Sequence, residues 1–149
     1  MAVGFLGAAA FFYMDSFRNP VEWIDPACPE RLLGRCWELL TITASGCQAV
    51  EQLELPVVCG TLLIPGDCGD KVLQLVRGAQ VVSYGVSGRD SLTFSSMETE
   101  QRLLCIQRSF HTLCGMLVEP QEILLPQKWR GLSDEAVLAW MGTKLLLGE

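Results

Sequence analysis

The stretch VVCGTLLI, residues 57–64, decides the fold of this chain. It is a continuous apolar run of strand length, and it ends in the turn-forming sequence PGDCGD, residues 65–70. Such a run, bounded by turn residues, is typical of a strand that is buried on both faces of a sheet. Residues 72–76 are mostly apolar and read as a short helix, and residues 81–86, VVSYGV, form a second strand-like run. Strand, helix and strand at this spacing predict a βαβ unit with parallel strands.

Upstream of this unit, the sequence predicts one strand and one helix. Residues 2–14 are apolar and predict a buried first strand, because they lack the basic start of a signal peptide and are short for a membrane span. Apolar side chains then recur at helical spacing, at Leu32, Leu33, Cys36, Trp37 and Leu40. We therefore expect a helix that begins near Pro29, is divided near Gly46 and has a second piece ending near Leu53.

Downstream of the unit, short strand-like runs follow one another. They lie at residues 92–97, 103–106, 113–118 and 122–125. Their succession predicts an antiparallel β-hairpin extension between about Ser91 and Leu125. Ser133 is a good N-cap with two acidic residues after it, and it predicts a final helix that reaches Leu147 and ends at Gly148. The expected fold class is α/β, with a mainly parallel sheet, flanking helices and this hairpin extension.

Length and composition predict a single domain over residues 1–149. Of the 149 residues, 50% are hydrophobic and 19% are charged, which suits one buried core rather than a disordered chain. The net charge is −6, with 17 acidic and 11 basic residues. Because an acidic surface repels phosphate backbones, we expect no nucleic acid among the partners, and no membrane.

The seven cysteines of the chain help to predict its cellular compartment. They stand at positions 28, 36, 47, 59, 68, 105 and 114. No two of them form a CxxC pair, the spacing typical of zinc sites. We therefore expect reduced cysteines that act as small apolar side chains in the cytoplasm, without zinc or another cofactor.

The order of these elements resembles the later half of the central, ATP-binding domain of the Mur ligases. These enzymes join amino acids to the nucleotide-linked precursor of the bacterial cell wall. The pieces that match are residues 63–67 (LIPGD), residues 81–85 (VVSYG), Asp90, residues 124–126 (LLP) and the helix over residues 134–147. The resemblance covers about residues 55–149, and it implies that the chain has the fold of part of that domain and comes from a bacterium.

The motifs that make a Mur ligase an ATPase are missing from this chain. No GxxxxGK(S/T) loop occurs, the Asp-His pair of the family would fall near Asp15-Ser16, and its GxHNxxN motif would fall at residues 128–134, which read KWRGLSD. The resemblance therefore implies a shortened relative, and we expect a non-catalytic binding or assembly module that forms a homo-oligomer or binds a protein partner. The alternative is a small enzyme, or a nucleotide- or sugar-nucleotide-binding protein, with its site at the carboxyl ends of the strands.

The turn after residues 57–64 is the first candidate site. The residues that would form it are Gly66, Asp67, Gly69 and Lys71. They precede a helix, whose free N–H groups favour an anion. The carboxylates of the same turn would repel phosphate, so an ordinary strand–helix turn with acidic capping is the alternative.

A second candidate is a divalent metal site formed by Asp15, Asp67 and Asp90. Each of them lies near the end of a predicted strand, and such ends meet at one edge of a parallel sheet. The alternative is that these residues only fill turns and cap helices.

Two thiols are further candidates for reactive groups. Cys68 stands at a predicted helix start, which lowers a thiol pKa, but Asp67 and Asp70 oppose that effect. His111 and Cys114 could pair as base and nucleophile, yet a strand would place them on opposite faces. A histidine at a strand end that meets solvent is the alternative.

Titration of free thiols in the denatured protein should find all seven cysteines reduced. The physical reason is that a reducing compartment keeps thiols from pairing. The reagent is applied to protein purified without added oxidant, and a second sample treated with a reductant serves as the control. A lower count in the untreated sample would contradict the assignment to the cytoplasm.

Overall fold

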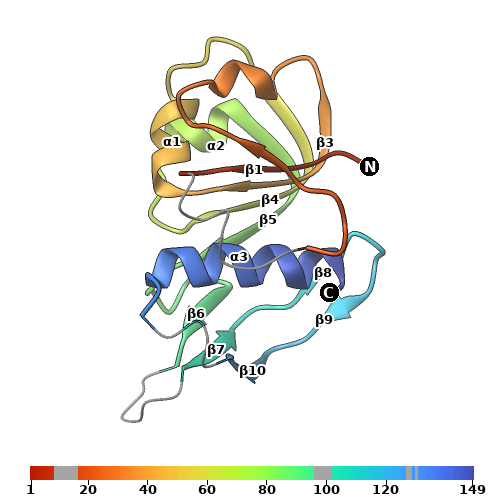
Figure 1. Cartoon of the computed structure of the whole chain (residues 1–149), viewed down its shortest axis with the longest axis vertical. Helices are drawn as coiled ribbons and strands as arrows, with labels where there is room; N and C mark the ends of the chain where they lie inside the picture. Colours follow the sequence, from red (N-terminus) through yellow and green to blue (C-terminus); the bar gives the residue numbers. More distant parts are fainter. Residues whose placement is uncertain (9–16, 96–101, 127–128, 130) are drawn as a thin grey trace.

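The computed structural model describes residues 1–8, 17–95, 102–126, 129 and 131–149 (Figure 1). Within these residues one sheet contains β1 (Val3–Leu6), β2 (Glu22–Ile24), β3 (Cys36–Ile42), β4 (Val57–Pro65), β5 (Val76–Tyr84), β6 (Leu92–Phe94), β7 (Leu103–Ile106) and β10 (Gln121–Leu124). The strands lie in the order β10-β7-β6-β5-β4-β3-β1-β2. The six strands from β2 to β6 in this order run parallel, and β7 is antiparallel to both of its neighbours. The predicted α/β class with a mainly parallel sheet is therefore confirmed.

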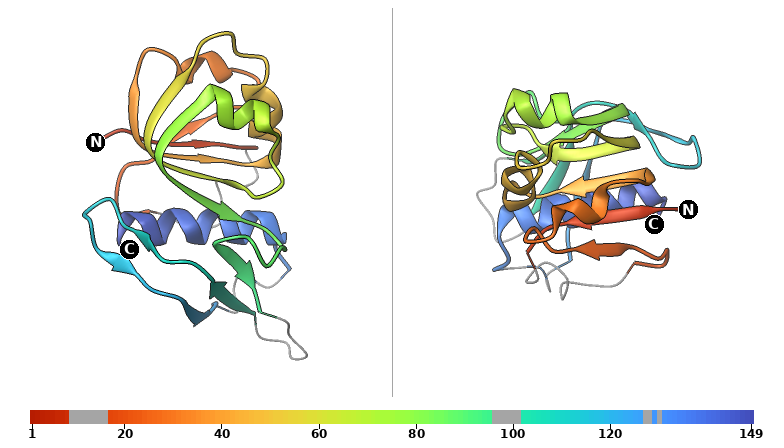
Figure 2. Two further views of the ribbon diagram at one scale, coloured as in Figure 1. Left: turned by 180° about the vertical axis from the view of Figure 1, so that it is seen from behind. Right: turned by 90° about the horizontal axis from the view of Figure 1, so that it is seen from above.

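Helices cover both faces of the sheet (Figure 2). One face carries the 3-10 helix η2 (Pro29–Leu32) and the short helices α1 (Ala44–Val50) and α2 (Asp70–Leu75), which pack in one apolar core with β3 and β4. The other face carries the long helix α3 (Asp134–Leu147) over a second apolar core. The sheet thus lies between two layers, which is why residues 39–42 of β3 and residues 61–65 of β4 are buried on both faces.

The helix α3 follows the prediction at both of its ends. The side chain of Ser133 accepts a hydrogen bond from the backbone N–H of Ala136 (3.1 Å), and Gly148 ends the helix in the left-handed conformation (φ 77°). In the middle, the hydroxyl groups of Thr143 and Thr41 on β3 are 2.7 Å apart. The helix is buried on several sides rather than on one face, because the β-rich segment after β6 also packs on it.

The βαβ unit around residues 57–64 is confirmed. β4 and β5 pair in parallel from Val57 opposite Val76 to Pro65 opposite Tyr84, with α2 between them. The antiparallel extension is confirmed as well, since β6, β7 and β10 pair antiparallel in the main sheet. A separate hairpin, β8 (Phe110–His111) with β9 (Leu117–Val118), lies in the same part of the chain.

The helix predicted from Pro29 is wrong beyond its first turn. η2 ends at Leu32, Gly34 adopts a positive φ of 75°, and the chain continues as the strand β3. Residues 39–42 of β3 are buried on both faces because β1 and β4 flank the strand. Such a strand has no alternation of polar and apolar side chains, so its pattern coincided with helical spacing.

Gly46 does not divide a helix but lies inside α1. Thr43 caps this helix, and its Oγ1 accepts a hydrogen bond from the backbone N–H of Gly46 (3.3 Å). A Cβ at Gly46 would lie 2.6 Å from the carbonyl oxygen of Leu6, so glycine allows α1 to approach β1. The predicted first strand is β1, and residues 9–14 of that prediction lie outside the described residues.

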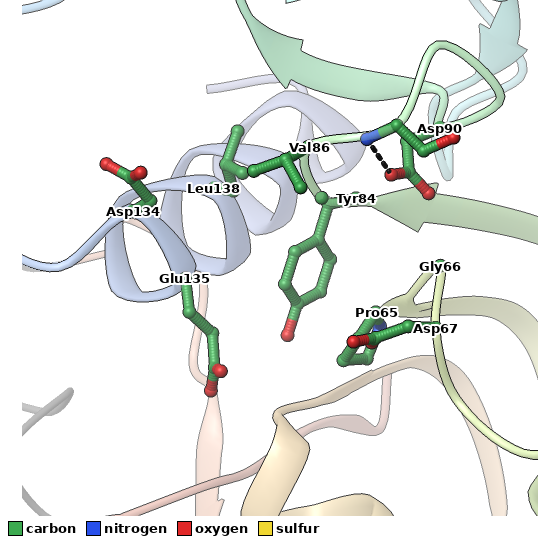
Figure 3. A pocket seen from close by; sticks show the side chains of 11 residues that line it. Pro65, Gly66, Asp67, Tyr84, Val86, Asp90, Asp134, Glu135 and Leu138 are labelled. Carbon is green, nitrogen blue, oxygen red and sulfur yellow. Dashed lines mark hydrogen bonds between the residues drawn. The ribbon is translucent and has the colours of Figure 1, made fainter.

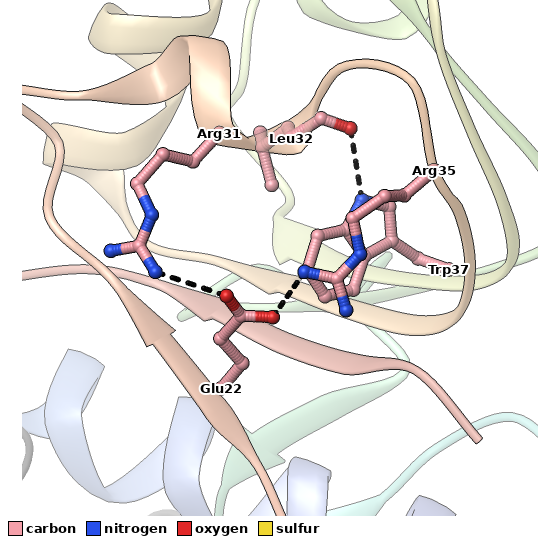
Figure 4. Close-up of polar contacts among 5 residues, drawn as sticks. All are labelled: Glu22, Arg31, Leu32, Arg35 and Trp37. Carbon is pink, nitrogen blue, oxygen red and sulfur yellow. Dashed lines mark hydrogen bonds and ion pairs between the residues drawn. The ribbon is translucent and has the colours of Figure 1, made fainter.

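A polar cluster ties the edge strand β2 to the turn before β3 (Figure 4). The carboxylate of Glu22 binds the guanidinium groups of Arg31 (3.0 Å) and Arg35. Arg35 lies over the ring of Trp37, 4.1 Å from its centroid, and the indole N–H of Trp37 donates to the carbonyl of Leu32. Each ion pair is partly exposed and stabilises little alone, but together with the buried ring they fix this edge of the sheet.

Replacing Gly142 with valine should destabilise the fold by about 2 to 3 kcal/mol. A Cβ at Gly142 would lie 2.7 Å from Cδ2 of Leu63 and 2.9 Å from Cδ1 of Leu92, and both leucines are fully buried. Urea unfolding followed by circular dichroism measures the effect. Met141→Val makes a residue of the same shape one position earlier in α3, at a half-buried site, and should cost about 1 kcal/mol. Equal losses would contradict close packing at Gly142.

Candidate functional site

A cavity of about 270 Å³ opens at the carboxyl ends of β4 and β5 (Figure 3). Its lining residues follow these two strands or begin α3, and they are Pro65, Gly66, Asp67, Tyr84, Gly85, Val86, Ser87, Asp90, Asp134, Glu135 and Leu138. The carboxyl ends of parallel strands are where open α/β sheets bind their ligands. We therefore treat this cavity as the candidate site.

Asp90 is the most buried carboxylate of the cavity, with 4% of its surface exposed. Its Oδ2 accepts a hydrogen bond from the backbone N–H of Ser87 (3.0 Å). The carboxylate lies against two glycines, since a Cβ would come within 1.7 Å of Oδ1 at Gly66 and within 2.6 Å of Oδ2 at Gly85. The turns after β4 and β5 can therefore approach each other around Asp90 only because both carry glycine.

Tyr84 forms the floor of the cavity, and its hydroxyl is already engaged. The hydroxyl donates a hydrogen bond to the carbonyl of Ile42 at the end of β3 (2.9 Å). Burial, and then the nearby carboxylate of Glu135, raise the pKa of this phenol. The phenol therefore stays protonated at neutral pH.

Glu135 turns its carboxylate across the cavity to the start of α1. Its Oε1 accepts a hydrogen bond from the backbone N–H of Ala44, the first residue of that helix (3.2 Å). A carboxylate stabilises the positive end of a helix dipole there. The start of α1 is thus occupied by Glu135 from α3.

The cavity is negatively charged. Among its lining residues, all of them described, four are acidic and none is basic. Outside the lining, the guanidinium of Arg102 forms an ion pair with Asp134 and donates to the carbonyl of Leu132 (3.1 Å). Because Arg102 compensates the charge of only one of the four acidic side chains, the cavity opposes the entry of phosphate groups.

The structure separates the residues of the predicted anion site. Gly66 and Asp67 line the cavity, whereas Gly69 and Lys71 lie at the start of α2 and Lys71 is exposed. The backbone N–H of Gly66 donates to the carbonyl of Tyr84 (2.9 Å), so it is not free for a ligand. The geometry is that of a strand–helix turn.

Two members of the predicted metal site lie in the same cavity. These are Asp67 and Asp90, while Asp15 lies outside the described residues. Within the residues that the structure describes, no group of three or more His, Cys, Asp or Glu side chains is placed to hold a metal ion.

The thiols of Cys47, Cys59 and Cys68 have raised pKa values. Burial, and then Asp67 and Asp70, raise the pKa of the Cys68 thiol, as the opposing carboxylates suggested. Burial likewise raises the pKa of Cys47 to about 12 and that of Cys59 to about 11. All seven cysteines are free thiols in the structure.

His111 has a structural role at the end of β8. Its backbone N–H donates to Oε1 of Gln80 (2.8 Å), and its carbonyl accepts from Nε2 of the same side chain (2.9 Å). Cys114 is exposed in the turn that follows, and among the described residues no hydrogen bond joins it to His111. The side chain of Gln80 thus fastens the hairpin to β5.

Sequence reasoning did not assign Tyr84, Glu135 or Leu138 to a site. Tyr84 was noted only as part of a strand motif, and Glu135 as an acidic residue in the first turn of a helix. The signal that could have pointed to Glu135 is its position at the start of the final helix, since that start also meets the strand ends in a parallel sheet.

Comparison of the chain with protein-family models, with curated proteins and with solved structures finds no match. Of the helices that the structure describes, none has the length and apolar character needed to cross a membrane.

Replacing Gly66 with alanine should destabilise the fold by about 2 to 3 kcal/mol, because the new Cβ collides with Asp90. The same substitution made in an Asp90→Ala background should cost less than about 1 kcal/mol, since the colliding carboxylate is gone. Urea unfolding of the four proteins of this cycle gives both values.

Gly88→Ala is the matched control for this cycle. It lies in the same loop as Asp90, and a Cβ there meets no atom within 4 Å. We expect a change within about 0.5 kcal/mol. A cost for Gly66→Ala that does not depend on Asp90 would show that the close approach is not the cause.

Proposed function

We propose that this chain is a non-catalytic binding or assembly module, derived from a Mur-ligase-like domain and lacking its ATP site. The observation that carries the proposal is that the chain's own carboxylates occupy the strand ends. Glu135 accepts a hydrogen bond from the first N–H of α1, and Asp90 fills the space between the turns after β4 and β5. The carboxylates at the strand ends are thus used to stabilise the fold.

The apolar part of the cavity supports a binding role. Tyr84 and Leu138 are buried beside the carboxylates, and the side chain of Val86 is exposed at the rim. Ligand sites commonly combine such an apolar lining with a few polar groups. The charge of the cavity favours a ligand without phosphate groups.

The second candidate is a small enzyme, or a nucleotide- or sugar-nucleotide-binding protein, that uses the same cavity. The position of the cavity at the carboxyl ends of β4 and β5 favours it. A ligand that carries phosphates is what separates the two candidates, because only the second requires one.

The assembly role would involve a second copy of the chain or a protein partner in the cytoplasm of a bacterium. Large apolar side chains are exposed at Met116, Leu117 and Leu124, on the β-rich segment after β6. Free thiols throughout the chain suit a reducing compartment. These observations support the proposal, and the solution mass of the protein tests it.

Calorimetric titration with ATP and magnesium should detect no binding tighter than about 100 μM, equivalent to about −5.5 kcal/mol. The carboxylates of the cavity repel the triphosphate, and the first N–H of α1 is already bonded to Glu135. A uridine diphosphate sugar, titrated in the same way, extends the test to the second candidate.

Binding of either compound would favour the second candidate. The variants Asp67→Ala and Lys71→Ala would then separate the two possible locations. Asp67 lines the cavity and Lys71 does not, so a change in affinity for the first variant alone would place the ligand in the cavity.

A further inference from the structure

The outer edge of β10 is an exposed strand edge at one end of the sheet (Figure 1). Among the described residues no strand pairs with it, and Leu124 has 57% of its surface exposed. The strand at the opposite end, β2, differs, because Ile24 is fully buried and Glu22 is held by two arginines. Both β2 and β10 end the sheet, and of these two described strands only β10 exposes a large apolar side chain.

The register with β7 determines which backbone groups of β10 face outward. The backbone N–H of Leu125 donates to the carbonyl of Arg102, directly opposite (3.0 Å). Hydrogen-bonded pairs alternate along an antiparallel ladder, so the odd-numbered residues of 121–125 turn their backbone groups to β7. Glu122 and Leu124 therefore turn their N–H and C=O groups away from the sheet.

Two prolines limit this edge. Pro120 and Pro126 have the same parity as Glu122 and Leu124, so they stand at the next outward positions on either side. Proline has no N–H to donate. Pairing on this edge is thus confined to the short segment between the two prolines, which prevents the addition of longer strands. The outward N–H groups of Glu122 and Leu124 within that segment stay available.

We propose that a second copy of this chain pairs with this edge, with the two β10 strands antiparallel about a two-fold axis at Ile123. In this register Glu122 lies opposite Leu124 of the second copy, and each such pair exchanges both of its backbone hydrogen bonds. Pro120 lies opposite Pro126 of the second copy, so the pairing segments of the two strands begin and end at the same positions. This inference rests on the assembly role proposed above and names the surface that carries it.

The side chains of the segment suit a second copy. Glu122 meets an apolar side chain of the other copy rather than Glu122 itself, so no like charges stand directly opposite. Ile123 meets Ile123 of the second copy on the face where α3 packs, next to the apolar core. Leu124 is exposed in the single chain. In the dimer, the Leu124 side chain of each copy gains a neighbour on the other copy.

Sedimentation velocity over a range of protein concentrations tests the proposal. The wild-type chain should show a species of twice 16.4 kDa. Leu124→Glu should weaken the dimer about tenfold or more, because it places like charges opposite each other in both pairs. Leu124→Lys should preserve or strengthen the dimer, because lysine then lies opposite Glu122 of the second copy.

Two further variants separate the edge from general surface effects. Leu117→Glu adds the same charge at a residue of β9 that is 53% exposed and outside the register, and it should leave the dimer unchanged. Glu122→Pro removes an outward N–H without touching the ladder to β7, and it should weaken the dimer while circular dichroism shows a folded chain.

The outcomes distinguish this inference from the proposed function. A wild-type dimer that is weakened by Leu124→Glu and preserved or strengthened by Leu124→Lys supports both the proposed function and the β10 interface. A dimer that is insensitive to Leu124→Glu and Glu122→Pro overturns the β10 interface and leaves assembly standing through another surface. A wild-type chain that stays at 16.4 kDa at every concentration, or that pairs through β10 only with a strand of another protein, overturns pairing with a second copy.

Discussion

The packing of α3 on the sheet is the contact on which the rest of the structure depends. This last helix is far from β3 and β4 in the sequence, yet Thr143 reaches the hydroxyl of Thr41, and Gly142 brings the helix close to Leu63 and Leu92. The first turn of α3 supplies the carboxylate that accepts a hydrogen bond from the first N–H of α1, so the helix joins the two faces of the sheet. Without it, one whole apolar face of the sheet would meet water.

The end of the chain after α3 also holds the segment that leads into the edge strand β2. The carboxylate of Glu149, just after α3, accepts hydrogen bonds from the backbone N–H of Arg18 and from Asn19. Partial burial opposes ionisation, but these hydrogen bonds and Lys144 lower the pKa of Glu149 below its ordinary value. Because the folded pKa is the lower one, this contact stabilises the fold at neutral pH and is lost as the pH falls through that pKa.

Local patterns predicted the parts of the fold whose partners are close in sequence. The run at residues 57–64, its turn and the next strand form one βαβ unit, and the caps of α3 are set by Ser133 and Gly148 themselves. β3 could not be predicted in this way, because its identity as a strand depends on β1 and β4 on either side. An apolar run that is buried on both faces carries no periodicity of its own, and helical spacing then arises by coincidence.

The candidate site was predictable only as far as topology allowed. That Asp67 and Asp90 lie together follows from the rule that parallel strands end at one edge, whereas the arrival of Glu135 depends on how α3 crosses the sheet. Once there, three polar groups of the site are used by the chain itself. Asp90 accepts a hydrogen bond within its turn, Glu135 accepts one from the first N–H of α1, and the hydroxyl of Tyr84 donates one to the end of β3.

A ligand that entered the cavity would have to compete with these internal partners or bind beside them, and each displaced bond would leave a buried group unsatisfied at a cost of about 1 to 3 kcal/mol. On the outer edge of β10 no described strand bonds to the backbone groups, so a partner strand would not have to displace one. Association at that edge therefore requires no rearrangement of the fold, and this difference is the physical reason to look for the function in assembly before catalysis.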